Sequence, residues 1–371
     1  MIKVIEVLTD TNIGGAGIWL LNFLEFYDRE KLDISVVIPT ESMLKERIEK
    51  INVRVIEAES IGDISFSIDG FKELLEIFKA ENPQVIHTHA CLSARLAAKK
   101  LKIPTVNTRH CIEPTKKGIK KLIYGYINRF LSDYTVAVSK SVKENLIADG
   151  MAEDNIFVVY NGVKPLYKYS EFERIQLRRR MGVDGCFVFG IFARLEEVKN
   201  HSLFLRAAAS AYEVSDKFRF LVVGDGSLME ELKQEAEDLG LKDAVLFTGF
   251  MPDITELMNA IDINVLTSYS EAMSISLVEG MTVGKPSIAT DSGGPREVIE
   301  NGKTGIIVPN NDSVNLTFAF LKLATDRSLL EEFGKEAERQ AKEKFSPEEM
   351  AEKLLKIYEK VSRKGVANEE V

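Results

Sequence analysis

The chain of 371 residues is longer than one ordinary hydrophobic core can use, so two domains are expected. Hydrophobic residues make up 45% and charged residues 28%, as in a globular protein, and no stretch has the apolar length of a membrane span. Three scattered cysteines and four histidines, also unclustered in the sequence, argue against a disulfide framework and a structural zinc site and indicate a reducing, cytoplasmic compartment. The net charge of −9 and the lack of a recognisable binding motif argue against nucleic acid as a partner.

Short β-branched runs alternate with helical periods along the whole chain. In the first half, strands are predicted over residues 2–8, 34–38, 53–56, 85–87, 104–108, 134–138 and 156–159. In the second half, they are predicted over residues 187–192, 218–223, 244–248, 261–266, 286–289 and 305–308. Several of these runs are continuously apolar, which is typical of strands buried on both faces of a parallel sheet. The alternation therefore predicts an α/β protein with two doubly wound domains.

The domain boundary is placed at the turn sequence of residues 161–165, which precedes a polar, arginine-rich helix. The N-terminal domain would span residues 1–164 and the C-terminal domain residues 165–346. After Ser346, a proline and two acids give the typical start of a helix, so a terminal helix is predicted over residues 347–365.

Two carboxylates, Glu271 and Glu279, stand eight residues apart where a predicted strand end runs into a helix. A carboxylate in this position accepts hydrogen bonds from ligand hydroxyls, and the helix N-terminus offers free N–H groups to a phosphate. A sugar nucleotide presents both kinds of group.

Two cations, Arg194 and Lys199, bracket the turn after the first predicted strand of the second half. Fixed cations at a strand-to-helix turn can neutralise a diphosphate leaving group. They would equally serve as exposed surface charges. The chain contains no Asp-x-Asp, the usual short metal-diphosphate handle, so a metal-independent site without a cofactor is expected.

Glycines follow the predicted strands of both halves. Gly14 and Gly15 precede a helix, where they would let the backbone approach an anion closely or would simply serve a tight turn. Their spacing is neither a dinucleotide fingerprint nor a P-loop. In the second half, the glycines at strand ends are Gly224, Gly226, Gly249, Gly293 and Gly294.

Histidines end two strands of the first half. His110 follows the fifth strand, and His87 and His89 end the fourth. A histidine at a strand end is available to a sugar hydroxyl or a phosphate, although a single histidine is more often structural. His110 is the preferred functional residue and His89 the second.

Together these residues resemble the retaining glycosyltransferases of family GT4. The resemblance covers nearly the whole chain and is densest over residues 190–305. The pieces that carry it, by their order and spacing, are Ala193-Arg194-Leu195 with Lys199-Asn200, Val223-Gly224-Asp225-Gly226, Phe247-Thr248-Gly249, Ser270-Glu271 with Glu279, Asp291-Ser292-Gly293-Gly294 with Glu297, Ala137-Val138-Ser139 and Tyr160-Asn161-Gly162.

The resemblance implies the GT-B fold, with two Rossmann-like domains facing across a cleft and the terminal helix after Pro347 packing back on the first domain. Arg194 and Lys199 would hold the donor diphosphate. Glu279 would accept from the ribose hydroxyls, and Glu271 would contact the transferred sugar.

The remaining implied roles concern the first domain and the loop glycines. The amides of Gly14 and Gly15 would face the phosphates or the sugar, and His110 would bind the sugar near its reacting carbon. Ser274 and the strand-end glycines of the second half would complete the donor site. The chain departs from the family pattern in Ala272-Met273-Ser274 and in Gly280, positions at which sugar choice would change.

The expected activity is retaining transfer of a hexose-type sugar from a nucleoside diphosphate, UDP in the first instance, to an acceptor hydroxyl. One alternative is a UDP-sugar epimerase of the same fold, which would need no acceptor. A second is a non-catalytic subunit that binds the nucleotide sugar and transfers nothing. A dehydrogenase is disfavoured because the dinucleotide fingerprint is missing.

A basic segment lies between Arg95 and Asn145, with 12 basic and 3 acidic residues. Within it, Lys116, Lys117, Lys120 and Lys121 precede an apolar helical stretch. Such a segment suits an anionic membrane surface and a lipid-linked or glycan acceptor of cell-surface polysaccharide assembly, at the inner face of the membrane. A solvated helix face is the alternative interpretation.

Overall fold

The computed structural model describes residues 1–367 and divides the chain into two compact units. Unit 1 comprises Met1–Val163 and the chain from Ser346 on, and unit 2 comprises Lys164–Phe345. Within the described residues, one parallel sheet forms the centre of each unit, with seven strands in unit 1 and six in unit 2.

The unit 1 sheet has the order β3-β2-β1-β4-β5-β6-β7, and all its neighbours are parallel. In this order its strands are β3 (Arg54–Ala58), β2 (Leu32–Pro39), β1 (Ile2–Leu8), β4 (Val85–His89), β5 (Thr105–Arg109), β6 (Tyr134–Ala137) and β7 (Ile156–Val158). All of β4 and residues 4–8 of β1 are buried, including the polar side chains of Glu6, His87 and His89, as expected for central parallel strands.

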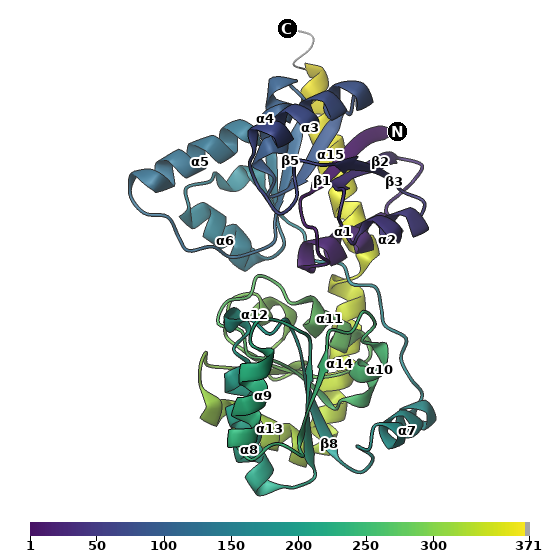
Figure 1. The fold of residues 1–371 in the computed structure, drawn as a ribbon, viewed down its shortest axis with the longest axis vertical. Helices are drawn as coiled ribbons and strands as arrows, with labels where there is room; N and C mark the ends of the chain where they lie inside the picture. Colours follow the sequence, from purple (N-terminus) through teal and green to yellow (C-terminus); the bar gives the residue numbers. More distant parts are fainter. Residues whose placement is uncertain (368–371) are drawn as a thin grey trace. The chain divides into compact units, whose positions relative to one another are not determined.

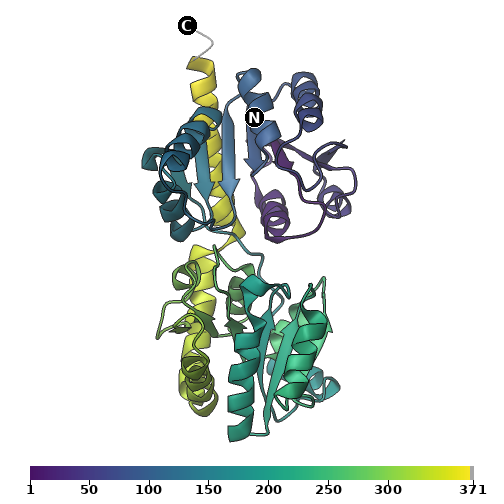
Figure 2. The same ribbon diagram turned by 60° about the vertical axis from the view of Figure 1, so that its left-hand side comes forward.

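Helices cover the unit 1 sheet. They are α1 (Gly15–Phe26), α2 (Lys45–Lys50), α3 (Ile68–Glu81), α4 (Leu92–Lys100), α5 (Ile119–Leu131), α6 (Lys140–Ala148), the 3-10 turn η1 (Glu153–Asn155) and α15 (Pro347–Ala367). The last of these, drawn in yellow in Figures 1 and 2, runs beside the strands of unit 1 and contacts α1, β1 and β4. The end of the chain thereby contributes to the core of the unit formed by its beginning.

The unit 2 sheet has the order β10-β9-β8-β11-β12-β13, also parallel throughout. Its strands are β10 (Val245–Gly249), β9 (Phe218–Val223), β8 (Phe187–Phe192), β11 (Ile263–Leu266), β12 (Ser287–Thr290) and β13 (Gly305–Val308). Its helical elements are α7 (Glu171–Arg180), η2 (Glu197–Lys199), α8 (His201–Val214), α9 (Met229–Asp238), α10 (Thr255–Ala260), α11 (Ile275–Thr282), α12 (Pro295–Val298), α13 (Ser313–Thr325) and α14 (Arg327–Lys344).

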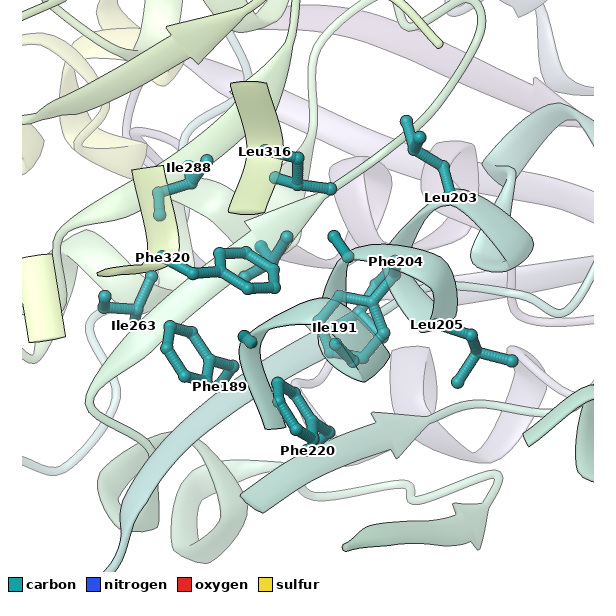
Figure 3. Packing of buried hydrophobic residues seen from close by; sticks show 14 of the residues in the cluster. Phe189, Ile191, Leu203, Phe204, Leu205, Phe220, Ile263, Ile288, Leu316 and Phe320 are labelled. Atoms are coloured by element: carbon teal, nitrogen blue, oxygen red, sulfur yellow. The ribbon is translucent and has the colours of Figure 1, made fainter. Parts of the chain in front are cut away.

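Both faces of β8 are buried in hydrophobic clusters. Phe189 and Ile191 face a cluster with α8 and α13, in which the rings of Phe189 and Phe320 stack with centroids 4.4 Å apart (Figure 3). The alternate residues Val188 and Phe192 face a second cluster on the other side of the sheet. This two-sided burial explains the unbroken apolar run of the strand and confirms the predicted doubly wound α/β fold.

The strand orders define where each unit can hold a ligand. In unit 1, successive strands are added on one side of β1 as far as β3 and on its other side from β4 on. In unit 2, the same change of side occurs between β8 and β11. Ligands of open α/β sheets bind outside the carboxyl ends of the strands at such switch points. No helix in the described part of the chain combines the length and apolar character that crossing a bilayer requires.

Candidate active site

The loop after β8 carries the first predicted cation. Leu195 N donates to Asp225 O at 2.9 Å, so the loop continues the pairing with the chain beyond β9. The Arg194 side chain is exposed, and no hydrogen bond or ion pair joins it to any described residue. A guanidinium that the fold holds by its backbone and leaves without a partner is available to an anionic ligand.

Lys199 ends η2, and the residues after β11 hold it in place. Thr267 Oγ1 donates to the carbonyl oxygens of Lys199 and Asn200, at 3.0 and 2.9 Å. Lys199 Nζ lies 2.5 Å from Glu271 Oε2, and Ser268 Oγ donates to the same oxygen at 3.3 Å. The structure therefore joins two predicted site residues that are 72 positions apart in the chain.

The main chain of Glu271 connects the loops after β11 and β12. Its N–H donates to Ser292 O at 2.9 Å, and its carbonyl accepts from Gly294 N at 2.8 Å. Both ends of the Lys199–Glu271 pair are thus fixed by the backbone, which lowers the entropy cost of presenting the ammonium group to a ligand.

Glu279 lies on α11, whose first residue follows the N-cap Ser274. The Ser274 hydroxyl accepts from Leu277 N at 3.4 Å, so the predicted donor residue Ser274 begins the helix. The half-buried carboxylate of Glu279 has no hydrogen-bond or ion-pair partner among the described residues. Burial raises its pKa to about 7. A carboxylate to which no protein group donates can accept hydrogen bonds from the hydroxyl groups of a ligand.

The structure itself requires most of the predicted glycines of unit 2. A Cβ on Gly224 would lie 2.0 Å from Ala193 O, and one on Gly226 would lie 2.4 Å from Leu195 O. A Cβ on Gly294 would lie 2.0 Å from Ala272 O. These glycines permit close approach of the loops that carry the charged residues, which accounts for them without a direct ligand contact.

Other predicted glycines are in open positions. A Cβ on Gly15 would meet nothing within 4 Å, and one on Gly14 would meet only the Asp10 carboxylate at 3.9 Å. Gly14 is the N-cap of α1, with no side chain capping the helix and no acid in its first turn. The fold does not need glycine here, so the open space is available to an anion at the helix N-terminus. Gly249 and Gly293 both adopt positive φ, at 73° and 105°.

His110 is part of a buried hydrogen-bonded chain in unit 1. Its Nε2 lies 2.8 Å from His89 Nδ1, and His89 Nε2 lies 3.0 Å from Glu6 Oε2. His87 Nδ1 lies 3.1 Å from the other oxygen of Glu6, and the Tyr358 hydroxyl donates to that oxygen at 2.6 Å. Three of the four histidines therefore cluster in space, because the adjacent strands β4 and β5 end side by side.

Glu6 and Tyr358 are the cluster members that the sequence analysis missed. Glu6 is completely buried in β1, and Tyr358 comes from α15. An acid inside an otherwise apolar strand was a signal for Glu6, because carboxylates are rarely buried without partners. Nothing near Tyr358 in the sequence indicates its contact with a residue 352 positions away.

Burial and mutual contacts set the protonation of this cluster. Burial alone raises the pKa of Glu6, but the charge of His87 and hydrogen bonds from His87 and His89 outweigh it and bring the pKa to about 2. Burial lowers the pKa of His89 and lowers that of His110 well below its usual value. Glu6 is thus an ionised carboxylate, and His89 and His110 are neutral imidazoles at neutral pH.

The same cluster has the ligand types of a divalent metal site. The ligand atoms of Glu6, His87 and His89 all lie within 4.8 Å of one another. Each already takes part in a hydrogen bond, and the Tyr358 hydroxyl lies 2.6 Å from both His87 Nδ1 and Glu6 Oε1. A metal ion would have to displace this hydroxyl from a fully buried position, so hydrogen bonding accounts for the cluster better.

Two family models match successive parts of the chain. The model described as Glycosyltransferase Family 4 matches residues 13–165, and the model described as Glycosyl transferases group 1 matches residues 176–340. The chain belongs to the family 4, group 1 glycosyltransferases. As a member of this family it is a transferase enzyme, which sets aside the epimerase and the non-catalytic subunit.

Two curated relatives of this glycosyltransferase match most of its length. The UDP-Gal:alpha-D-GlcNAc-diphosphoundecaprenol alpha-1,3-galactosyltransferase of Escherichia coli is 27% identical over 348 residues, covering 88% of this chain and 89% of the relative. The N-acetyl-alpha-D-glucosaminyl L-malate synthase of Bacillus anthracis is 27% identical over 302 residues, covering 78% of each chain.

Solved structures establish the fold of this glycosyltransferase as GT-B. HepE of Anabaena, in complex with UDP and glucose, superposes with a TM-score of 0.85 at 24% identity, covering 96% of this chain and 99% of HepE. Sucrose-phosphate synthase of Thermosynechococcus elongatus superposes with a TM-score of 0.74 at 16% identity, covering 97% and 99%.

The departures of this glycosyltransferase from the family pattern lie in the loop before α11 and, for Gly280, within α11 itself. Ala272 and Met273 are buried, with 6% and 5% of their surfaces exposed. A Cβ on Gly280 would lie 2.7 Å from Asn264 Nδ2, so the close contact of α11 with β11 favours glycine at this position. Packing thus explains both Ala272 and Gly280.

The basic segment of this glycosyltransferase runs from α4 to α6 and includes α5. An apolar stripe on α5 faces solvent, comprising Ile119, Leu122, Ile123, Tyr126, Ile127 and Phe130. Lys117 and Lys120 are exposed beside it. Lys116 instead bonds Glu113 and Asp149, at 2.9 and 3.1 Å, so it is part of the fold. The four predicted lysines are therefore not equivalent.

Proposed function

We propose that this glycosyltransferase moves a hexose-type sugar from UDP to an acceptor hydroxyl and retains the configuration at the anomeric carbon. The observation that carries the proposal is the pair of unpartnered charges in unit 2. Arg194 offers an exposed cation to a diphosphate, and Glu279 offers a half-buried carboxylate to ribose hydroxyls. Both belong to loops and helices that follow β8 and β11, the neighbours at the switch point.

The choice of UDP draws support from similar proteins. The HepE structures contain UDP, UDP with glucose, and UDP-glucose. The name of the Escherichia coli relative specifies UDP-Gal as its donor. These properties belong to those proteins, and their recurrence among proteins of the same fold makes UDP the first nucleotide to test here.

The proposed step exchanges one carbon–oxygen bond for another. The bond between the anomeric carbon and the diphosphate breaks, and the diphosphate takes the electron pair. The acceptor oxygen bonds the same face of the sugar, and its proton passes to the leaving diphosphate. Arg194 and Lys199 stabilise the charge that develops on the diphosphate. No carboxylate is assigned as a nucleophile.

We further propose that this site works without a metal ion or other cofactor. Arg194 and the fixed ammonium of Lys199 supply the positive charge that a divalent ion would otherwise provide. The sequence has no Asp-x-Asp handle for such an ion.

The acceptor is proposed to be a glycan or lipid-linked molecule at the inner face of the membrane, as in polysaccharide or glycolipid assembly. The support is α5, where an exposed apolar stripe lies beside exposed lysines, the composition of a helix that binds an anionic membrane surface. The names of two relatives also refer to lipid-linked molecules. One relative acts on a diphosphoundecaprenol acceptor, and another is an alpha-monoglucosyldiacylglycerol synthase.

A donor screen followed by product analysis tests the proposal. Thermal shift with UDP, GDP, ADP and their glucose conjugates should favour UDP, because a specific ligand raises apparent stability. Transfer to a lipid-linked acceptor, read by NMR of the anomeric proton, should give retained configuration and persist in EDTA. Arg194→Ala should lower turnover about 10²-fold or more, with Arg327→Ala as a control at another exposed arginine of unit 2. Inverted product, or turnover that needs added Mg²⁺, would contradict the proposal.

A further inference from the structure

Glu6, His89 and His110 form a line of hydrogen bonds that runs from the interior of unit 1 to its strand-end loops. Glu6 is completely buried and His89 is 3% exposed, whereas His110 is half-buried in the loop after β5. The planes of the two imidazoles are 26° apart, with centroids at 5.1 Å and the bonded nitrogens at 2.8 Å. The ring of Trp19 packs on both at 5.0 and 5.6 Å.

The direction of each hydrogen bond follows from the chemistry of its acceptor. An ionised carboxylate can only accept, so His89 Nε2 carries the hydrogen that it donates to Glu6 Oε2. A neutral imidazole has one donor and one acceptor, which leaves His89 Nδ1 as the acceptor. His110 Nε2 must therefore donate to it, and His110 Nδ1 must be the nitrogen without a hydrogen.

The other Glu6 oxygen strengthens this assignment. The Tyr358 hydroxyl donates to Glu6 Oε1 at 2.6 Å, and His87 Nδ1 lies 3.1 Å from the same atom. Both oxygens thus have donors directed at them, which keeps the carboxylate ionised and unable to donate to His89. Burial also lowers the pKa of His89, so this imidazole remains neutral and continues to accept from His110.

We propose that Glu6 and His89 are positioning residues that fix His110 in the tautomer with hydrogen on Nε2, so that Nδ1 can only accept a hydrogen bond. This inference rests on the proposed function and on the role that the family resemblance implies for His110, contact with the transferred sugar. No described residue bonds to His110 Nδ1, so it is available to a ligand.

The consequence is a preference among donor sugars. A sugar hydroxyl at this contact can donate to Nδ1, whereas a carboxylate, a carbonyl or an O-acyl group cannot. A site that places an acceptor there rejects a sugar without a donating group, because one polar atom of the pair would be left unpaired. The buried glutamate thereby acts on substrate choice through two imidazole rings.

The tautomer of His110 is measurable without any activity. The chain has four histidines, so ¹⁵N-histidine labelling and long-range ¹H–¹⁵N spectra can be assigned with single variants. In the wild-type protein, His110 should show protonated Nε2 and unprotonated Nδ1 near neutral pH. The opposite tautomer, or a mixture of the two, would overturn the proposal without requiring that any variant folds.

A pair of matched variants on β4 separates positioning from packing. His89→Phe keeps a ring and removes both nitrogens, and His87→Phe makes the same change two residues earlier, at a side chain that is equally buried and also bonded to Glu6. His89→Phe should release His110 into a mixture of tautomers, whereas His87→Phe should leave it fixed. His89→Asn places an oxygen near the former Nδ1 and should restore the single tautomer. Equal spectra for His89→Phe and wild type would refute the relay, that is, the fixing of the His110 tautomer by Glu6 through His89.

Donor kinetics distinguish this proposal from the proposed function. His89→Phe should raise the KM for UDP-glucose about 3- to 10-fold, the size expected for one hydrogen bond, and leave the Kd of UDP unchanged. His110→Ala should raise it at least as much. If the tautomer is as stated but His110→Ala does not alter donor kinetics, the relay is correct and the assigned sugar contact of His110 is wrong. If His110→Ala raises KM and His89→Phe does not, the relay itself is wrong.

Discussion

Lys199 Nζ and Glu271 Oε2 lie 2.5 Å apart and join the loops that follow β8 and β11. With 21% and 11% of their side-chain surfaces exposed, the two groups are shielded enough for their attraction to fix the ammonium in place. The pair therefore holds the Lys199 ammonium at the carboxyl ends of the strands, where a diphosphate is proposed to bind.

Replacing Lys199 by alanine should abolish most activity. We expect turnover to fall about 10²-fold or more, because the charge that stabilises the leaving diphosphate is removed. Steady-state kinetics with UDP-glucose and acceptor measures this loss. Lys303→Ala, which breaks a surface Lys–Glu pair of the same unit, is the control and should keep wild-type turnover. Comparable rates for the two variants would remove Lys199 from the mechanism.

Two glycines should respond in opposite ways to a single added methyl group. Gly294→Ala forces a Cβ to within 2.0 Å of Ala272 O and should cost about 1–3 kcal/mol of stability or more. Gly15→Ala meets nothing within 4 Å inside a helix and should keep or raise the melting temperature. If the N-terminus of α1 binds the donor, Gly15→Ala should nevertheless raise the donor KM. A stable Gly15→Ala protein with unchanged KM would assign these glycines to the turn alone.

Glu279 should make stability and donor binding depend on pH. Its pKa of about 7, against an ordinary 4.5, means that the folded chain holds this proton more tightly than the unfolded chain does. The group therefore lowers the free energy of unfolding progressively as pH rises from 4.5 to about 7, and by a constant amount above that. Denaturant unfolding of wild type and Glu279→Gln at about pH 5 and about pH 8 should show this loss in the wild type only.

UDP affinity gives the complementary measurement on Glu279. The ionised carboxylate accepts hydrogen bonds from ribose hydroxyls better than the neutral acid does. The affinity of the wild-type protein for UDP should therefore increase as pH rises through about 7. Glu279→Gln should bind UDP more weakly and with a flat pH profile. Parallel profiles in calorimetric titration would show that Glu279 does not contact the nucleotide.

The exposed stripe of α5 should bind anionic vesicles. Replacing Lys117 and Lys120 by glutamine, or Leu122 and Tyr126 by serine, should each reduce co-sedimentation with phosphatidylglycerol vesicles, since apolar burial and charge attraction both contribute. Lys353→Gln, on α15, is a control lysine away from this helix. Binding that is equal for all these proteins would leave α5 as an ordinary solvated helix.

Lys116 belongs to the four lysines predicted to face a membrane, but its replacement is not a useful test of vesicle binding. It bonds Glu113 and Asp149, and Asp149 is completely buried. Lys116→Gln would lower stability by removing the cation beside a buried carboxylate, so a loss of vesicle binding in that variant would be ambiguous.

The fold could be predicted because its signal is local. Strands such as β1 and β8 are short runs rich in apolar residues, and each is followed by a loop that contains charged residues, so each element is recognisable within about ten residues. The parallel arrangement then brings Arg194, Lys199 and Glu271 to one edge of a sheet. Knowledge of sheet topology was sufficient to group them.

The buried network of unit 1 could not be predicted in the same way. Its bonds join Glu6 to His87 and His89 across 81 and 83 residues, and Tyr358 joins it from the far end of the chain. Local patterns contain no information about which distant side chains share a buried volume. The only local sign was the acid in β1, because a buried carboxylate needs donors, but the sequence does not say which residues supply them.

The central claim is that protein cations and a carboxylate of unit 2 hold the diphosphate and ribose of UDP. A crystal structure of the UDP complex grown in EDTA tests it most directly. We predict the diphosphate within hydrogen-bond distance of Arg194 and Lys199, and the ribose hydroxyls bonded to Glu279. UDP bound away from these three side chains, or bound only when a divalent ion is supplied, would contradict the account.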